Sequence, residues 1–585
     1  MALKRLIPEA PMRKIAVVLA LVFSSILVGC TAMPTSGPVE YLQGVEPHEQ
    51  RPKINVAPLP PEQDASAQMI IEGFLAAMES SADDYAVAKK YLTPEASDQW
   101  DPEASVLVYS KQSTYEQGPS NSISLRLEEV GNLDGSGFYT SRKPHEVTIN
   151  LRLQQVDGQL RISNPMPGIV LSSQRFERSF APVKAYFVAL DESSVVPQQV
   201  FLQAARLNLD EIVKTVLRGP NKWLAPVVKN YAQDASLSSE TWIDNDKIAR
   251  VSLTGVSQDI SPDQAELLAA QLLAALTNFQ RIQGVKIKVD DLDLRMSGSK
   301  SGTLLAKDCG LLKPLTQDAY KIVGVATEKP VEIDDGGRVT PLPQFDGIPE
   351  LLVSQVAAND SSIAVTSNSD SQIWLSKDSG QAEKIFDGES ISSLQFTGDY
   401  LWWLADTASG TSIFRRSGDG TVDSQEIIAL RGRKITALSV CQDNAYAALV
   451  VNDEYGQLFG MVRINNVDGL KIDGWREVPL NWKDGKITSV KDAAWASGNR
   501  IVYLGSSASD GKTIAFATDM DAAIVSSLGP YSEVEAVKII AAPVGSLTST
   551  MVLTNTGRVL KFEEQYRWPV FANDLSNISY AIDKA

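Results

Sequence analysis

The sequence predicts a multidomain protein in which two α+β domains are followed by an all-β domain of repeated short strands. Two patterns predict this order. Helix-period and strand-period segments follow one another up to about residue 312, whereas from about residue 318 helical patterns stop and short apolar strands recur. The 585 residues, 44% of them hydrophobic, suffice for several cores, since a domain usually has roughly 100 to 200 residues.

The amino-terminal segment predicts export and lipidation. Four basic residues within the first fourteen precede an apolar run over 15–28, which is too short for a comfortable permanent membrane span. The run ends in Leu27-Val28-Gly29-Cys30, which resembles the bacterial lipobox. This resemblance implies that residues 1–29 are a removed signal peptide and that Cys30 becomes an N-palmitoyl, S-diacylglycerol cysteine. Such acylation anchors a protein stably in lipid.

The expected location is therefore the extracytoplasmic face of the cell membrane, with the lipid-anchored chain outside. Two alternatives stay open for this segment. It also fits an ordinary signal or a membrane anchor with an incidental cysteine, and Met12 in place of Met1 would begin a more compact signal.

The acidic composition excludes one class of partner. The whole chain has a net charge of −17 and residues 1–29 carry +3, which leaves −20 on the mature part. Nucleic acid requires basic surface that displaces its counterions, so we expect no nucleic-acid partner.

The few cysteines and histidines argue against a disulfide framework and against a metal site. Cys309 and Cys441 lie far apart in different predicted domains, so we expect buried free thiols. The only histidines are His48, in a polar segment, and His145, at the start of a strand-like run. Neither has a neighbouring ligand set, so we expect no zinc site and no histidine-based triad.

Two aspartate clusters have residue types that also bind calcium. Asp290-Asp291-x-Asp293 lies at a predicted strand end and Asp334-Asp335-Gly336-Gly337 is typical of a hairpin turn, so we interpret both as solvated turns. No Gly-x-Ser-x-Gly, His-Glu-x-x-His or P-loop motif occurs. The sequence therefore predicts no catalytic residue, no cofactor and no metal.

A tether and a first α+β domain follow Cys30. Residues 30–63 are rich in Pro, Glu and Gln without any helical or strand period, which predicts a flexible tether. One helix is predicted by a line of apolar residues, namely Met69, Ile70, Phe74, Leu75 and Met78. A second, before Thr93-Pro94, is predicted by Tyr85, Ala88 and Tyr91. Alternating strands follow at 106–109, 123–127 and 147–151, so we expect an NTF2/cystatin-like α+β domain over 64–178.

A second α+β domain is predicted over 180–312. Strands at 186–190 and 199–202 precede a helix over 210–217, which Arg218-Gly219-Pro220 ends. After a strand at 248–253, Ser261-Pro262-Asp263-Gln264 has the features of a capped helix start. With the last strand at 285–289, the predicted order is β-β-α-β-α-β.

Internal repeats predict the architecture of residues 318–585. Five similar strand starts occur near residues 351, 391, 435, 490 and 537, with offsets of 40, 44, 55 and 47 residues. A four-stranded propeller blade takes roughly 40 to 50 residues, so we expect a β-propeller of about five or six blades. A β-sandwich remains the alternative. We also expect residues 322–325 to pair with 559–562, so that strands from both ends close the ring.

Particular motifs resemble one family along nearly the whole chain after Cys30. Phe74-Leu75-Ala76-Ala77-Met78, Tyr91-Leu92-Thr93-Pro94 and Trp100-Asp101-Pro102 resemble the amino-terminal domain of the actinobacterial lipoprotein LpqB family. Tyr186-Phe187 and Leu217-Arg218-Gly219-Pro220 resemble its GerMN domain, and the terminal third resembles its propeller.

This resemblance implies a binding protein without enzymatic activity. It implies an accessory protein of the MtrA–MtrB two-component system, which contacts the extracytoplasmic domain of the sensor histidine kinase MtrB and influences cell-wall and division homeostasis. The alternative is a lipoprotein that binds cell-wall glycan or peptide, since aromatic side chains stack on sugars. The candidate tryptophans are Trp223, Trp242, Trp475, Trp482 and Trp568, whereas Trp402 and Trp403 are expected to fill a strand core. An outer-surface enzyme is the third and least favoured hypothesis.

Overall fold

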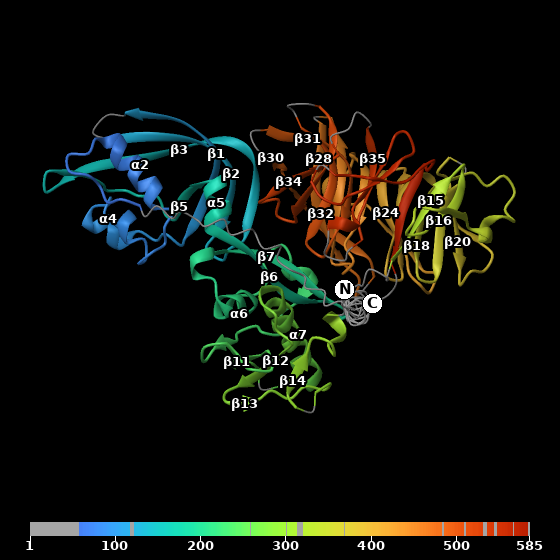
Figure 1. Cartoon of the computed structure of the whole chain (residues 1–585), viewed down its shortest axis with the longest axis horizontal. Coiled ribbons are helices and arrows are strands. Elements are labelled where there is room, and N and C mark those ends of the chain that lie inside the picture. Colours follow the sequence, from blue (N-terminus) through green and yellow to red (C-terminus); the bar gives the residue numbers. More distant parts are fainter. Residues whose placement is uncertain are drawn as a thin grey trace, which may run out of the picture. The chain divides into compact units, whose positions relative to one another are not determined.

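Three helices begin the part of the chain that the structure describes (Figure 1). The computed structural model describes residues 58–582, apart from 118–121, 258, 300, 313–319, 368, 455, 468, 483–484, 508–510, 531–534, 543–546 and 566. The helices are α2 (Ala67–Ala77), α3 (Ala86–Lys89) and α4 (Pro94–Gln99). Cys30, His48 and the predicted tether up to residue 57 lie outside the described residues.

The expected apolar side of α2 is confirmed in part. Ile70, Phe74 and Leu75 are buried, but Met69 is 46% exposed and Ile71 occupies the core in its place. The second helix, expected before Thr93-Pro94, is present as α3, whereas the helix that follows Thr93 was not predicted. The Thr93 side chain accepts a hydrogen bond from the Ala96 backbone N–H and caps the additional helix α4.

The helices precede a five-stranded sheet with the order β4-β3-β2-β1-β5. Its strands are β1 (Ser105–Gln117), β2 (Ser122–Asp134), β3 (Tyr139–Val156), β4 (Gln159–Ile162) and β5 (Ile169–Ser172). The three predicted strands lie within β1, β2 and β3, which pair antiparallel, while β5 pairs parallel with β1. A short helix, α5 (Ser173–Ser179), then leads out of the sheet.

The next segment pairs two long strands and packs a helix beside them. β6 (Phe180–Ala189) and β7 (Val195–Gln203) are antiparallel, and β8 (Val228–Lys229) adds to β6. Between β7 and β8 in the chain lie η1 (Ala204–Arg206), α6 (Leu209–Leu217) and η2 (Ala225–Val227). α6 ends as predicted, because Arg218 is its C-cap and Gly219 has φ +84°.

A longer helix then covers a second small sheet. α7 (Pro262–Phe279) begins with the predicted capping box, in which the Ser261 and Gln264 side chains each accept a backbone N–H. The sheet pairs β11 (Ile248–Thr254) parallel with β12 (Gly284–Val289). Shorter strands flank them: β9 (Ser236–Leu237), β10 (Trp242–Ile243), β13 (Leu292–Asp293) and β14 (Thr303–Leu305), followed by η3 (Gly310–Leu312). The order β-β-α-β-α-β is thus confirmed for the main elements.

Antiparallel sheets fill the described chain from residue 320 onward, and this described part contains no α-helix. The first group of strands contains β15 (Tyr320–Ala326), β16 (Lys329–Ile333), β17 (Val339–Pro341) and β39 (Asn577–Ile582). A parallel pairing joins it to the second group, so that these two groups form one eight-stranded sheet. The second contains β18 (Val353–Asn359), β19 (Ser362–Ser367), β20 (Gln372–Lys377) and β21 (Glu383–Asp387). The third contains β22 (Glu389–Thr397), β23 (Tyr400–Thr407), β24 (Gly410–Arg416) and β25 (Val422–Gln425).

Three further sheets continue the series. The fourth contains β26 (Lys434–Val440), β27 (Tyr446–Asp453), β28 (Gly456–Asn465) and β29 (Lys471–Glu477). The fifth contains β30 (Asn481–Trp482), β31 (Gly485–Trp495), β32 (Arg500–Ser507), β33 (Thr513–Asp519) and β34 (Val525–Gly529). The sixth contains β35 (Ala536–Ile540), β36 (Met551–Thr554), β37 (Val559–Lys561) and β38 (Val570–Ala572). The 3₁₀ turns are η5 (Pro343–Phe345), η6 (Ile428–Leu430) and η7 (Leu547–Ser549).

These sheets form a closed, propeller-like ring. One strand of each group contacts one strand of the next, in the order β18, β22, β26, β31, β35 and β39. The parallel pairing of β39 with β18 closes the ring. The five repeat starts seen in the sequence fall in or beside β18, β22, β26, β31 and β35. Strands from both ends of the segment do pair, but the expected partner was wrong. β15 pairs with β39, whereas residues 559–561 form β37 between β36 and β38.

Polar side chains of one sheet bind the backbone of the next around this ring. Gln355 Nε2 donates to the Ile391 carbonyl at 2.9 Å, and Ser393 Oγ accepts from Leu438 N at 3.1 Å. Asp492 Oδ2 likewise accepts from Ile539 N at 2.9 Å. These bonds satisfy backbone groups at the sheet boundaries and connect neighbouring sheets.

The cores do not separate at the predicted domain boundaries. One buried cluster runs from Val183 to Ala522 and includes side chains of β6, α7, β27 and β32. The described residues accordingly belong to one compact unit. The ring and the segment before it therefore share apolar packing across the junction between them.

Candidate functional site

The candidate aromatic platforms differ greatly in exposure. Trp242 on β10 is 56% exposed, whereas Trp402 and Trp403 are fully buried, as expected. The indole N–H of Trp568 donates to the Leu528 carbonyl at 2.8 Å, and that of Trp223 to the Gly474 carbonyl at 2.6 Å. Of the five candidate tryptophans, Trp242 is exposed and the other four are partly buried.

Both aspartate clusters form turns. Asp293 pairs with Lys286 at 2.7 Å, and the Asp290 carboxylate accepts from Thr254 Oγ1 at 2.7 Å. Asp334 Oδ1 accepts the backbone N–H groups of Gly336 and Arg338, at 3.0 and 2.9 Å. Within the described ranges, no three His, Cys, Asp or Glu side chains gather in a way that would hold a metal ion.

Cys309 and Cys441 are both buried free thiols. Burial raises the pKa of each thiol above its ordinary value. The His145 Nε2 lies 3.4 Å from Glu129 Oε2.

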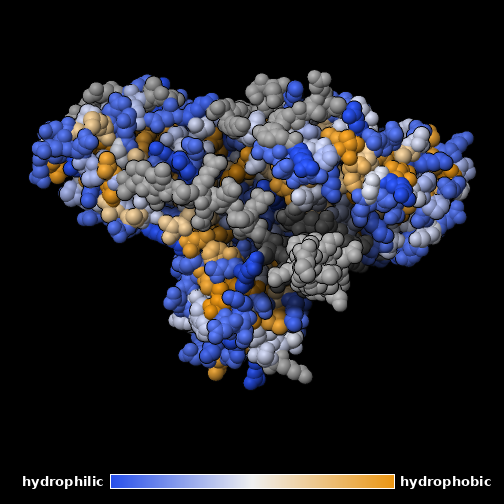
Figure 2. All heavy atoms as spheres, in the orientation of Figure 1, coloured by the Kyte–Doolittle hydropathy of each residue, from blue (hydrophilic) through white to orange (hydrophobic). Residues whose placement is uncertain are grey.

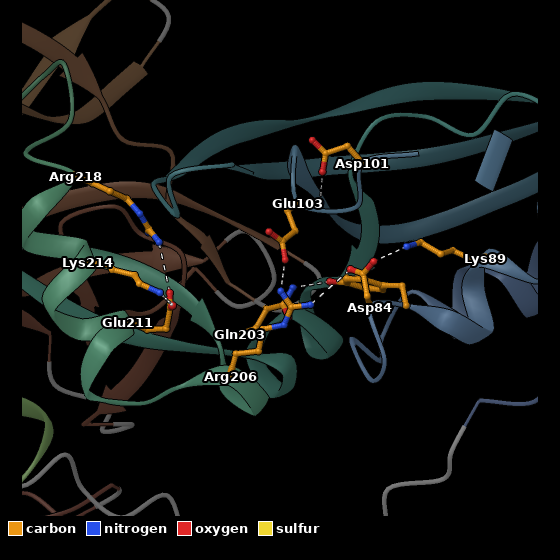
Figure 3. A network of polar contacts seen from close by, with 10 residues as sticks. Asp84, Lys89, Asp101, Glu103, Gln203, Arg206, Glu211, Lys214 and Arg218 are labelled. Atoms are coloured by element: carbon orange, nitrogen blue, oxygen red, sulfur yellow. Dashed lines mark hydrogen bonds and ion pairs between the residues drawn. The ribbon is translucent and has the colours of Figure 1, made fainter. Parts of the chain in front are cut away.

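The first junction joins the helical start of the chain to the end of β7 (Figure 3). Arg206 pairs with Glu103 and lies 3.9 Å from Asp84, which in turn pairs with Lys89 at 2.5 Å. Gln203 Nε2 donates to the Tyr85 hydroxyl at 2.6 Å. Beneath these contacts Phe201 packs against the rings of Tyr139 and Phe176. The ion pairs are exposed, so that the aromatic packing supplies most of the stabilisation here.

The second junction joins β6 and β7 to the ring. Gln199 Nε2 donates to Asp521 Oδ2 at 3.1 Å, while its Oε1 accepts from Asn499 at 3.3 Å. A Cβ on Gly498 would lie 2.7 Å from Pro197 Cγ, so the two backbones approach closely. The Arg476 guanidinium lies 4.8 Å from the centre of the Trp223 ring, a cation–π geometry.

Burial shifts the ionisation of acidic groups at this second junction. Removal of water raises the pKa of Asp521 to about 7, and the neighbouring Asp519 adds to this shift. Burial also raises the pKa of Asp443 to about 7. For Asp519 the pKa is likewise raised, and for Lys184 burial lowers the pKa. Each shift disfavours the charged form.

The third junction contains an open cleft between β3 and the ring. The cleft measures about 420 Å³ and is lined by Ser141, Arg142, Lys143, His145, Glu477 and Pro479. Lys143 pairs with Glu477 at 2.6 Å, and Ser141 Oγ donates to the Pro479 carbonyl at 2.7 Å. Arg142 pairs with Glu129 at 2.9 Å. The lining is polar and its charged side chains already have partners, which fits binding of a polar surface better than covalent chemistry.

Two further observations concern the hydrophobic residues of the described chain. The face in Figure 2 is mostly hydrophilic, with hydrophobic residues in separate patches. No helix among the described residues has the length and apolar character that crossing a membrane requires.

Family models match the first two segments of the chain. The model of the lipoprotein LpqB N-terminal domain matches residues 60–177, and a model described as sporulation and spore germination, the GerMN domain, matches residues 184–294. Lipoprotein LpqB of Cutibacterium acnes is 27% identical over 586 residues, which cover 95% of this chain and 97% of that protein. This chain is therefore similar to lipoprotein LpqB along nearly its whole length. Lipoprotein LpqB of Streptomyces avermitilis is 25% identical over 82% of this chain and 84% of its own length.

Solved structures resemble part of this chain only weakly. A chain of the nidogen/laminin complex has a TM-score of 0.35 with 11% identity and covers 46% of this chain and 100% of that chain. TolB from Acinetobacter baumannii has a TM-score of 0.33 with 14% identity, over 45% of this chain and 66% of its own. At these scores the likeness carries no argument about function.

None of the three junctions was predicted from the sequence. Their polar residues, such as Gln199, Arg206 and Ser141, belong to no motif in the sequence. Gln199 and Asp521 are 322 residues apart, so local patterns carry no signal of their contact. A weak signal does exist for the cleft, because Arg142, Lys143 and His145 gather basic groups in an otherwise acidic chain.

Proposed function

We propose that this chain is an extracytoplasmic lipoprotein, held on the cell membrane by acylated Cys30, that binds and regulates a two-component sensor histidine kinase of the MtrB kind. Through that kinase it influences cell-wall and division homeostasis. The observation that carries the proposal is the end-to-end match to a lipoprotein LpqB, over 95% of this chain and 97% of the relative.

The proposed organisation is consistent with the same match. Residues 1–29 are the signal peptide and 30–63 the lipidated cysteine with its tether. Residues 64–178 form an NTF2/cystatin-like domain, 180–312 the GerMN domain and 318–585 a six-bladed propeller. The closed cycle of contacting strands supports the blade number.

The proposed mechanism is a shift of a conformational equilibrium in the kinase. A protein that binds one receptor conformation better than another shifts the receptor by that difference in affinity alone. The polar cleft beside Arg142 and Lys143 supports binding of this kind, because its charged side chains are 50% and 60% exposed. No catalytic step is required.

The test replaces Cys30 by alanine in the native cell and follows membrane fractionation and crosslinked co-purification of histidine kinases. We expect the wild type to stay with the membrane and to bring down a sensor kinase, and Cys30→Ala to be released or left unprocessed. The same replacement at the buried Cys309 is the control, and it should leave anchoring unchanged. Normal maturation and attachment of Cys30→Ala would contradict the lipobox interpretation.

One observation favours a second candidate, a binder of cell-wall glycan. The Trp242 indole is 56% exposed on the short strand β10, where a sugar face has access to it. If wall fragments and no kinase co-purify with the anchored wild type, and Trp242→Ala no longer retains them, the glycan-binding function takes precedence. Retention of a kinase without wall fragments excludes it.

A further inference from the structure

The turn between β33 and β34 contacts both domains that precede the ring. Its Asp521 accepts a hydrogen bond from Gln199 on β7, 3.1 Å away. Its Ala523 and Ile524 pack against the apolar core of the first α+β domain. The Met520 carbonyl accepts from Arg476 on β29 at 3.3 Å. This single turn, residues 519–524, therefore lies where all three parts of the molecule meet.

Acidic groups dominate the polar contacts of this turn. Asp519 and Asp521 are half-buried, and Asn499 Nδ2 lies 3.5 Å from Asp519 Oδ1. The charged and titratable groups that face the pair are Lys184 on β6, Arg476 on β29, Arg500 on β32 and Tyr139 on β3. Lys184 and Arg500 act on Asp519, while Arg476 acts on Asp521.

The cations do not bind Asp521 directly. Arg476 lies over the Trp223 ring and donates to a carbonyl, and the side-chain donor to Asp521 is the neutral amide of Gln199. An ionised Asp521 thus has one neutral side-chain donor, the backbone N–H of Ala523 at 2.9 Å and a second carboxylate beside it. A protonated Asp521 keeps the hydrogen bonds and removes the repulsion.

We propose that this turn is a proton-sensitive latch, which holds the two α+β domains on the ring while Asp521 carries a proton and loosens when Asp521 ionises. The latch needs no change in fold. It uses a carboxyl group at a contact between three parts of the chain, where the gain or loss of one charge changes how tightly the parts pack.

The direction of the pH effect follows from linkage. In the packed state the pKa of Asp521 is raised to about 7, and once separated the carboxyl regains a pKa near 3.8. Between these two pH values, the packed state therefore binds one more proton than the separated state. It is tightest below about pH 4, weakens by up to about tenfold per pH unit as the pH rises, and levels off above about pH 7.

The test measures amide hydrogen exchange of the full mature chain at pH 5.0, 6.0, 7.0 and 8.0, corrected for intrinsic exchange. Peptides from β7 and from the β33–β34 turn report the packing. We expect their protection to fall between pH 5.0 and 7.0 and to stay level above, and Asp521→Asn to keep high protection throughout. Asparagine has the same shape and accepts the Ala523 N–H without a charge.

Two control variants keep the result specific. Asp335→Asn changes an exposed acid in a hairpin turn and should retain the wild-type pH profile. Asp443→Asn changes another carboxyl whose pKa is raised to about 7. Protection that does not change with pH in the wild type would overturn the latch, and so would a pH dependence that persists in Asp521→Asn or disappears in Asp443→Asn. The wild-type profile decides the matter even if a variant fails to fold.

Discussion

Gly168 lies at a point of the first domain where no side chain fits. Its φ is +79°, and a Cβ there would lie 2.1 Å from the Ser105 carbonyl oxygen. Its N–H donates to Asp101 O at 2.7 Å, and its carbonyl accepts from the Trp100 indole at 3.1 Å. The backbone is held from both sides, so it has little freedom to move away from an added methyl group.

We expect Gly168→Ala to lower the free energy of unfolding by about 2–4 kcal/mol, from the unfavourable φ together with the overlap at Ser105. Urea unfolding of the mature chain, followed by tryptophan fluorescence, measures this loss. Gly158→Ala is the matched control, because Gly158 has φ +78° but nothing within 4 Å of the added Cβ. It should lose only about 1 kcal/mol. Equal losses in the two variants would show that the overlap at Gly168 is relieved.

Predictability from sequence at this scale depends on how local the interaction is. The helix cap at Ser261 and the stop at Gly219 were predicted, since each acts on residues within a few positions. The burial of Trp403 was predicted from its apolar strand. The Gln199–Asp521 contact was not, because nothing near either residue indicates a partner 322 positions away.

α7 is the element whose sequence and structure agree most fully. Its start combines Pro262 in the first turn with the reciprocal Ser261–Gln264 hydrogen bonds, at 3.2 and 3.1 Å. Its interior buries Leu268, Leu272 and Leu276 against β6 and β12. Start signals and apolar period support the same helix, so its bounds were predictable.

We expect Ser261→Ala to destabilise the GerMN domain by about 1 kcal/mol, because the backbone N–H of Gln264 loses its acceptor. Hydrogen exchange in the first turn of α7 measures the effect locally, and thermal unfolding measures it for the chain. Ser239→Ala, at an exposed position of the same domain, should be neutral. If both variants unfold alike, the capping box contributes nothing to stability.

Shorter elements escaped prediction for a common physical reason. α4 and α5 have 6 and 7 residues and bury Ala96 and Phe176 alone. Helices this short are marginal by themselves, so the surrounding packing decides that they form. The two-residue strands β9, β10 and β13 are likewise created by their neighbours.

Closure of the ring depends on β39 at the scale of the whole molecule. β39 lies between β15 and β18 and buries Ile578, Tyr580 and Ala581. The sequence predicts closure by strands from both ends, but it indicates residues 559–562 as the partner of 322–325, because that segment is as apolar as β39. Periodicity identifies strands, whereas the choice of partner depends on the geometry of the complete ring.

We expect removal of residues 577–585 to cost about 4–6 kcal/mol of stability, since two large side chains lose their burial and two sheet edges open. Differential scanning calorimetry and a test for aggregation measure the outcome. Removal of residues 583–585 alone, which follow β39, is the control and should leave the melting temperature unchanged. A ring that melts normally without β39 would mean that closure contributes little.

The position of β39 also determines when, during synthesis of the chain, the ring can close. The first sheet of the ring begins at Tyr320, yet its remaining strand ends only at Ile582. A ribosome therefore delivers more than 250 residues of ring sequence before the first sheet can be completed. A message that ends before the codon for Asn577 yields a chain with nearly all its strands and an open seam, whose unpaired strand edges are accessible to proteases.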